Sequence, residues 1–269
     1  MIRVAVLGAT GRMGQTLCRL IAAADDLQLT GAATEPGHAS VGQDAGAVAG
    51  LPSLGVLVTE DAASAVADCQ VAIDFTLPVA VPSHVAACIE ANAALVMGTT
   101  GLSKEQHALL EEAATRIAIV YGRNMSVGIN VLTELVRLTS RTLGSDYDVE
   151  ITEAHHRNKV DAPSGTALQL GESVARERGA SLEKLAVYAR HGSSEARQPG
   201  SIGFTSIRGG SVVGDHAVMF AADEEIIELR HRALDRAVFA RGALRAARWV
   251  IDQPVGLFSM NDVLGLDGR

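Results

Sequence analysis

Short apolar runs alternate with amphipathic segments through the first 126 residues. The runs at 2–7 and 27–33 are rich in β-branched and small apolar residues, as in strands buried on both faces of a parallel sheet. Between them, residues 15–24 place Leu17, Leu20 and Ile21 on one side of a helix. This alternation predicts an α/β fold with a Rossmann-like, doubly wound parallel sheet. Further strands are expected at 67–74, 94–97 and 117–121, with helices at 79–91 and 103–116, the latter capped by Ser103 and Gln106.

The pattern changes after residue 126. A strand predicted at 147–153 lies between helices at 127–143 and 164–178, and three alternating strands follow at 201–208, 211–221 and 225–232. Such a run predicts a second α+β domain with a mostly antiparallel sheet, whose open face can serve as an oligomer interface. A last helix at 236–252 is expected to pack back on the first domain. We therefore expect a dinucleotide-binding domain at 1–126, completed by 236–269, and a substrate-binding and oligomerisation domain at 127–235.

Composition excludes several classes of protein. The 269 residues are 48% hydrophobic and 20% charged, which is typical of a globular protein. A net charge of -8 and 3% aromatic residues argue against nucleic acid as the main partner, and no apolar stretch approaches the length of a membrane span. Met1, Ile2 and Arg3 lead directly into a strand-like run, so no signal peptide is expected. The three cysteines, none in a CxxC pair, fit a reduced cytoplasmic location without disulfides.

Three glycines separate the first predicted strand from the first helix. Gly8, Gly11 and Gly14 have the spacing G-x-x-G-x-x-G, a variant of the dinucleotide-binding fingerprint. Such glycines allow a tight turn, close approach of the backbone to a pyrophosphate, and close packing of helix on strand, while the helix N-terminus attracts the phosphates. Glu35 ends the second strand about 20 residues beyond Gly14, where an acid can bind the ribose hydroxyls.

Ligands of doubly wound sheets bind beyond the carboxyl ends of the strands. Four segments of this sequence follow predicted strands directly, and each could otherwise be a simple turn. The predicted cofactor contacts are therefore Gly8, Ala9, Thr10, Gly11, Arg12, Met13, Gly14, Glu35, Phe75, Thr76, Gly98, Thr99, Thr100, Gly122, Arg123, Asn124 and Met125.

The residue after Glu35 bears on the choice between NADH and NADPH. An acid at Glu35 repels a 2′-phosphate, whereas a nearby Arg would attract one. This chain has Pro36 next and no Lys or Arg closely following, so that Arg12 in the glycine loop is the basic side chain near enough to compensate. The sequence favours NADH as cofactor, with NADPH tolerated.

Between the strand at 147–153 and the helix at 164–178 lies a cationic loop. His155, His156, Arg157 and Lys159 fall within five residues. Pro163 suits the first turn of a helix, and Ser164, Gly165 and Thr166 present N–H groups and hydroxyls at its N-terminus, which is an anion site. A small dicarboxylate held between the loop and this helix, beside a nicotinamide, fits the pattern.

Two other interpretations of this loop stay open. The histidines could bind a metal, but adjacent histidines of a strand point apart, and no Cys or carboxylate spacing supports a site, so no metal is expected. The loop could also be a solvated charged surface, although the Pro-Ser-Gly-Thr helix start beside it argues against that.

Along essentially its whole length the sequence resembles the dihydrodipicolinate reductase family. The stretch at 153–167 is highly specific for that family. The matching motifs are VAVLGATGRMG (4–14), DFT (74–76), GTTG (98–101), NMSVGIN (124–130), EAHHRNKVDAPSGTA (153–167), VGDH (213–216) and MNDVL (260–264).

The resemblance implies NAD(P)H-dependent reduction of dihydrodipicolinate, derived from 4-hydroxy-tetrahydrodipicolinate, to tetrahydrodipicolinate in the diaminopimelate–lysine pathway. It implies that His155 is the acid/base residue and Lys159 the proton donor. It also implies that His156, Lys159, Gly165 and Thr166, with Ser164 beside them, bind the substrate carboxylates, and that the protein is a homotetramer assembled through its second-domain sheets.

Two departures from the family pattern stand out. Pro36 replaces the Arg that often follows the ribose acid, which puts a preference for NADPH in doubt. Asn158 stands where some relatives have His, which thins the cationic cluster but touches none of the implied roles.

Two rival functions remain. A dehydrogenase acting on an amino-acid semialdehyde would need a nucleophilic Cys or a different set of basic residues, and no Cys here lies near a His in the sequence. A regulatory protein that binds NADH without turnover has the same fold, and only the Lys159 loop argues against it.

Overall fold

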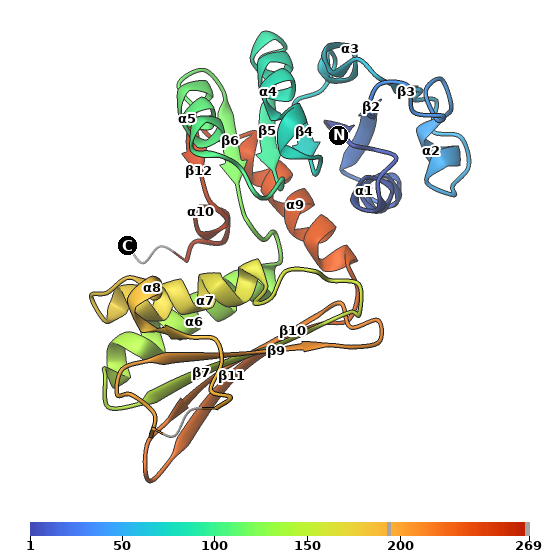
Figure 1. Cartoon of the computed structure of the whole chain (residues 1–269). Coiled ribbons are helices and arrows are strands. Elements are labelled where there is room, and N and C mark those ends of the chain that lie inside the picture. The colour runs from blue at the N-terminus through green and yellow to red at the C-terminus, as the bar shows by residue number, and fades with distance from the viewer. Residues whose placement is uncertain (193–194, 267–269) are drawn as a thin grey trace. The chain divides into compact units, whose positions relative to one another are not determined.

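The computed structural model describes residues 1–192 and 195–266, which form two compact units (Figure 1). Unit 1 comprises Met1–Val127 and the chain from Ala237 onward, and unit 2 comprises Gly128–Arg236. Among the helices of the described residues, none is long and apolar enough to cross a membrane. The roles predicted for the two regions, dinucleotide binding on the one hand and substrate binding with oligomerisation on the other, stay predictions.

Unit 1 contains a seven-stranded sheet in the order β12-β6-β5-β4-β1-β2-β3, and every pairing in it is parallel. Valine, isoleucine, leucine and alanine fill its central strands, so both faces can be buried. The strands are β1 (Ile2–Leu7), β2 (Leu27–Ala33), β3 (Val58–Thr59), β4 (Val71–Asp74), β5 (Ala94–Met97), β6 (Ala118–Tyr121) and β12 (Gly256–Phe258).

Helices cover both faces of this sheet, because successive side chains of a strand point to opposite sides. On one face Val4 and Val6 of β1 pack with α1 (Arg12–Ala22), α2 (Ala45–Val48), α9 (Ala237–Val250) and α10 (Met260–Leu264). On the other face Ala5 and Leu7 pack with α3 (Ala62–Val66), α4 (Val81–Glu90) and α5 (Lys104–Ala113). A short 3-10 helix, η1 (Pro78–Ala80), precedes α4.

The strands of unit 1 end at one level. Across the sheet, Ala33 of β2 pairs with Leu7 of β1, Leu7 with Asp74 of β4, Asp74 with Met97 of β5, and Met97 with Tyr121 of β6. The four segments predicted to bind cofactor, together with Glu35, therefore lie beside one another at the carboxyl edge, over a span of roughly 19 Å at ~4.8 Å per strand.

Unit 2 contains a five-stranded sheet in the order β11-β10-β7-β9-β8, with α6 (Val127–Leu143) and α7 (Gly165–Glu177) along one face (Figure 1). Among the described residues of this unit, no helix covers the other face. The remaining elements are β7 (Asp148–His155), α8 (Leu182–Leu185), β8 (Ala186–Val187), β9 (Ile202–Arg208), β10 (Gly214–Ala221) and β11 (Ile226–Ala233).

The predicted fold class is confirmed. All the longer predicted elements occur with bounds within a few residues, and the Ser103–Gln106 capping box begins α5. The predicted sheet of unit 2 is antiparallel where β10 pairs with β7 and β11, but β9 pairs parallel with β7 and with β8. The shortest elements were not predicted: they are α2, β3, α3, α8, β8, β12 and α10.

Candidate active site

The glycine loop of unit 1 has the geometry that its spacing predicts. Gly8 adopts φ +83°, a conformation that favours glycine. A Cβ on Gly14 would lie 2.1 Å from the carbonyl oxygen of Gly8, so only glycine lets α1 begin this close to the loop. A Cβ on Gly11 would lie 3.3 Å from the same oxygen, which is crowded but tolerable. Gly14 is therefore required for packing, and Gly11 is the position where the backbone stays open to a ligand.

The N-terminus of α1 is suited to a phosphate. Its N-cap residue is Gly11, which provides no side-chain cap, and its first turn contains no acidic residue. The first amides of a helix point outward with a partial positive charge, so they attract an anion that comes close.

A cavity of about 860 Å³ opens beside the glycine loop and extends past the ends of β2, β3 and β4. Of the predicted cofactor contacts, Gly8, Thr10, Gly11, Glu35, Phe75 and Thr76 line it. Its other polar lining residues, which the sequence did not single out, are Thr34, His38, Glu60, Asp61, Ser83, His84 and Glu90. A groove of this size is adequate for the adenosine half of a dinucleotide.

Several predicted cofactor contacts lie elsewhere in unit 1. Met125 is fully buried in the core, and Met13 packs against the same core. Arg12 is exposed and does not line the cavity. The remaining predicted contacts outside the cavity lining are Ala9, Gly14, Gly98, Thr99, Thr100, Gly122, Arg123 and Asn124.

The carboxylate of Asp74 ties together the ends of β4 and β5. It is fully buried, and its Oδ1 accepts hydrogen bonds from the backbone N–H (2.8 Å) and hydroxyl (2.6 Å) of Thr76 and from the hydroxyl of Thr99 (3.1 Å). Its Oδ2 lies 2.7 Å from Nδ1 of His84 on α4. Phe75 packs over Gly98, where a Cβ would lie 2.4 Å from the ring. The hydroxyls of Thr76 and Thr99 are thus oriented before any ligand binds.

In unit 2, the strand β7 positions a histidine–carboxylate pair. Glu153 and His155 are two residues apart, so they share the face of β7 that α6 and α7 cover. His155 Nδ1 lies 2.5 Å from Glu153 Oε2, and the guanidinium of Arg208 on β9 donates to both carboxylate oxygens at 2.8 Å. The side chain of Glu153 is 1% exposed, so this carboxylate interacts with the protein rather than with water.

These contacts fix the protonation of the pair. Burial alone would raise the pKa of Glu153, but hydrogen bonds from Arg208 and His155 outweigh it and lower the pKa to about 2. An ionised carboxylate only accepts, so Nδ1 of His155 carries the proton and Nε2 keeps its lone pair. Burial lowers the pKa of His155, with Glu153 opposing this effect. The neutral imidazole is ready to take up a proton at Nε2.

Lys159 lies in the loop after β7. Its side-chain Nζ lies 2.8 Å from Asp161 Oδ1, and its backbone N–H donates to the carbonyl oxygen of His156 at 3.1 Å. Its charge adds to the effect of burial, which lowers the pKa of His155. His156 is half-buried, whereas Arg157 and Asn158 of the same loop are exposed.

The N-terminus of α7 is built around Ser164, whereas Pro163, expected in the first turn, precedes the N-cap and lies outside the helix. Ser164 is the N-cap, and its Oγ accepts from the N–H of Ala167 at 3.2 Å. The backbone N–H of Ser164 donates to Glu153 Oε1 at 3.2 Å, and its Oγ lies 3.1 Å from Nε2 of His216 on β10. Gly165 is exposed and Thr166 half-buried at the first turn, which contains no acidic residue. Unit 2 therefore brings together His155, Lys159 and the helix start that the sequence predicted as an anion site.

Three residues of this cluster had no predicted role. Glu153 could have been found, because it lies two positions before His155 on a predicted strand. Arg208 and His216 come from β9 and β10 and could not be paired with β7 from sequence alone. The ring centroid of His216 lies 5.1 Å from that of His155, and burial lowers the pKa of His216 to about 4.

Comparison with known proteins supports the family suggested by the motifs. The sequence model "Dihydrodipicolinate reductase, N-terminus" matches residues 2–125, and "Dihydrodipicolinate reductase, C-terminus" matches residues 128–264. The chain is 52% identical over 266 residues to the 4-hydroxy-tetrahydrodipicolinate reductase of an Anaeromyxobacter species, which covers 99% of this chain and 98% of the relative. It is 48% identical over 266 residues to the enzyme of that name from Nitrosomonas eutropha, covering 99% of each.

A solved structure agrees. The dipicolinate-bound dihydrodipicolinate reductase from Paenisporosarcina sp. TG-14 superimposes with a TM-score of 0.74 at 25% identity, over 96% of this chain and 97% of that one. Sequence and fold thus match the same proteins from end to end, and the chain belongs to the dihydrodipicolinate reductase family.

Proposed function

We propose that the chain reduces dihydrodipicolinate, formed from 4-hydroxy-tetrahydrodipicolinate, to tetrahydrodipicolinate, with NADH as the preferred cofactor and NADPH accepted. The relatives that cover the whole chain carry the name of this activity, and the related structure binds dipicolinate, a planar dicarboxylate. The observation that carries the proposal is the His155–Glu153 contact of 2.5 Å beside Lys159 and the N-terminus of α7.

Three residues of unit 2 have distinct roles in this reaction. The bound nicotinamide supplies the hydride. Lys159 supplies a proton to the substrate ring, since an ammonium is a suitable donor, and His155 Nε2 relays protons as acid/base residue. Glu153 holds His155 in the tautomer that leaves Nε2 free, and is thus a positioning residue.

The substrate carboxylates bind cations and helix amides. His156 and Lys159 face one carboxylate, and Gly165 and Thr166 offer backbone N–H groups at the start of α7 to the other. Ser164, predicted as a further substrate contact, is buried and caps α7 instead. Glu153 accepts the N–H of Ser164, which holds the first turn of α7 beside His155.

The cofactor preference follows from the absence of positive charge around Glu35. None of the described residues that line the 860 Å³ cavity is Lys or Arg, and Arg12 does not reach it. Pro36 provides no guanidinium for a 2′-phosphate. Ribose hydroxyls beside Glu35 are therefore favoured over a phosphate.

Both rival functions are disfavoured. A semialdehyde dehydrogenase needs an ionisable cysteine, but Cys18, Cys69 and Cys88 are buried, and burial raises the pKa of the first two to about 11. A sensor that only binds NADH would have no use for a positioned His155–Glu153 pair.

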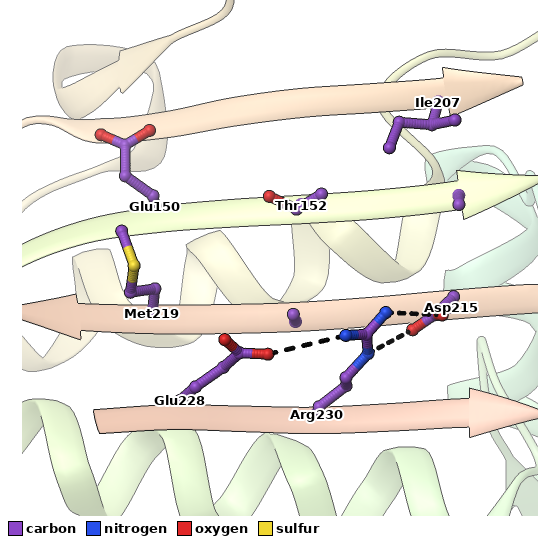
Figure 2. Close-up of a pocket in the computed structure, with 9 residues that line it drawn as sticks. Glu150, Thr152, Ile207, Asp215, Met219, Glu228 and Arg230 are labelled. Carbon is purple, nitrogen blue, oxygen red and sulfur yellow. Dashed lines mark hydrogen bonds and ion pairs between the residues drawn. The ribbon is translucent and has the colours of Figure 1, made fainter. Parts of the chain in front are cut away.

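We further propose a homotetramer assembled through the open face of the unit 2 sheet. Figure 2 shows this face, where a hollow of about 260 Å³ is lined by Thr152, Met219 and the ion-paired Asp215 and Arg230. Ile207 on this face is 52% exposed, and an exposed apolar side chain on a sheet face that no described helix of unit 2 covers favours an interface between subunits. Light scattering should give a tetramer that Ile207→Arg dissociates, whereas Leu138→Arg on α6 leaves it intact.

The first measurement is oxidation of NADH and NADPH by the purified protein. The substrate is the condensation product of aspartate semialdehyde and pyruvate, prepared enzymatically. We propose that the protein acts on the same compound in diaminopimelate and lysine biosynthesis in the cytoplasm. Rapid oxidation that depends on this substrate is expected, faster with NADH. Tight NADH binding without oxidation would contradict the reductase and support the sensor.

A further inference from the structure

The turn that follows Glu35 is held by a carboxylate from a distant part of the sequence. Strand β3 pairs with β2 through Ala33 and Thr59, which brings the next residue, Glu60, beside this turn. Glu60 Oε2 accepts a hydrogen bond from the backbone N–H of Gly37 at 2.9 Å. Glu60 is therefore bound to Gly37, which lies two residues after Glu35, the acid that is expected to bind the ribose.

Glu60 lines the same cavity as Glu35. The carboxylates around that cavity are Glu35, Glu60, Asp61 and Glu90, and its groups that can become cationic are His38 and His84. Asp61 is occupied by the start of α3, where it accepts from Ala63 and Ser64. His84 is occupied by Asp74. Glu60 is thus the carboxylate next to Glu35 that is anchored directly to the Pro36-Gly37 turn.

A 2′-phosphate at this position would meet two obstacles. It would bring a double negative charge close to both Glu35 and Glu60, and the backbone N–H of Gly37 would not be available to it, because that N–H already donates to Glu60. A ribose hydroxyl meets neither obstacle, since it is neutral and can donate to a carboxylate.

We infer that Glu60 is a specificity-determining residue that discriminates against NADPH. This inference rests on the proposed function, because it presumes that the cavity binds the adenosine half of a nicotinamide dinucleotide. It assigns a role to a residue outside the glycine motif and outside the first two strands, where such specificity is usually sought.

The test is to measure the binding of NADH and of NADPH in the absence of substrate, by fluorescence or calorimetry. Glu60→Gln keeps an acceptor for Gly37 and removes the charge, and Glu60→Ala also releases the Gly37 N–H. Both should raise the affinity for NADPH relative to NADH, by about 5- to 20-fold at low salt and less at high salt, because the exposed charge is screened. Glu111→Gln, on the exposed surface of α5, is the matched control and should leave the ratio unchanged.

The outcomes separate the two proposals. A wild-type protein that binds neither nucleotide would contradict the proposed function and the inference with it. Normal NADH binding with an unchanged NADPH-to-NADH ratio in both Glu60 variants would contradict the inference alone. Thermal unfolding of each variant establishes that it is folded, and Glu60→Gln decides the question if Glu60→Ala fails to fold.

Discussion

The Nδ1 atom of His155 lies 2.5 Å from the Oε2 atom of Glu153, two residues earlier on the same strand. Arg208 donates to both oxygens of that carboxylate and so holds it in place. The imidazole therefore has a fixed orientation and a fixed tautomer. The chemistry proposed for His155 depends on this relationship as much as on the histidine itself.

Removing the charge of Glu153 should slow turnover without abolishing binding. Glu153→Gln leaves a hydrogen-bonding side chain but no longer stabilises a protonated His155. We expect kcat to fall by about 10- to 100-fold, with a smaller change in KM, and the acidic limb of the pH–rate profile to move to lower pH because Glu153 raises the pKa of His155. Glu183→Gln, which removes the charge of an exposed glutamate of α8, is the control. An unchanged profile would remove Glu153 from the mechanism.

Loss of either proposed proton carrier should be severe. His155→Ala and Lys159→Ala are each expected to lower kcat by ~10²–10⁴-fold, the usual contribution of a positioned acid. Lys184→Ala, which removes an exposed lysine of α8, should have no effect. Steady-state kinetics with saturating NADH measures this. Wild-type turnover in both variants would mean that the assignments are wrong.

Two glycines of the same loop should respond differently to alanine. Gly14→Ala places a methyl group 2.1 Å from a backbone oxygen and should cost about 2 kcal/mol or more of stability. Gly11→Ala meets only a 3.3 Å contact and should unfold within a few degrees of the wild type, yet bind NADH at least 10-fold more weakly, since Gly11 lines the cavity. Thermal unfolding and NADH titration test both. Gly209→Ala, where the added methyl group finds no neighbour, is the control.

The free energy of unfolding should fall as the pH is lowered from about 6.5 to about 4. An unfolded histidine binds a proton near pH 6.5, whereas buried His216 does so only near pH 4, so protonation in this range favours the unfolded state. Glu153, with its pKa lowered from 4.5 to about 2, extends the loss of stability to lower pH.

His216→Gln should therefore reduce the difference in stability between pH 7 and pH 5 by roughly 1 to 2 kcal/mol. Urea unfolding at a fixed protein concentration measures it, and substitution of the exposed His191 by Gln is the control. Equal pH dependence in both variants would show that His216 does not cause the effect.

Most of the fold could be predicted because the patterns that specify its longer helices and strands lie within short stretches of sequence. The alternation of apolar strands with amphipathic helices specifies the parallel sheet, and the spacing of Gly8 and Gly14 specifies the loop between β1 and α1. Short elements escaped prediction: α2 contains only Ala, Gly and Val, and β12 is three residues long. Neither is long enough to show a periodicity.

The residues of the candidate site likewise fall into those that could be predicted from local sequence and those that could not. His155, Lys159 and Ser164 lie within one loop and its flanking elements, so their sequence pattern was informative. Arg208, His216 and Glu60 reach their partners only through strand pairing, and the register of β9, β10 and β3 is set by the whole sheet. Tertiary packing, rather than propensity, decides which distant side chain completes a local motif.

Strands β6 and β12 are neighbours in the sheet of unit 1, although all of unit 2 lies between them in the chain. During synthesis on the ribosome, unit 2 is therefore complete before α9 and β12 emerge. Until then the face of the sheet that α9 covers, including Val4 and Val6, remains uncovered. The segment from α9 to β12, which is made after unit 2, thus completes the sheet of unit 1, and a product that stopped after unit 2 would leave β6 without its outer neighbour and the face with Val4 and Val6 without α9.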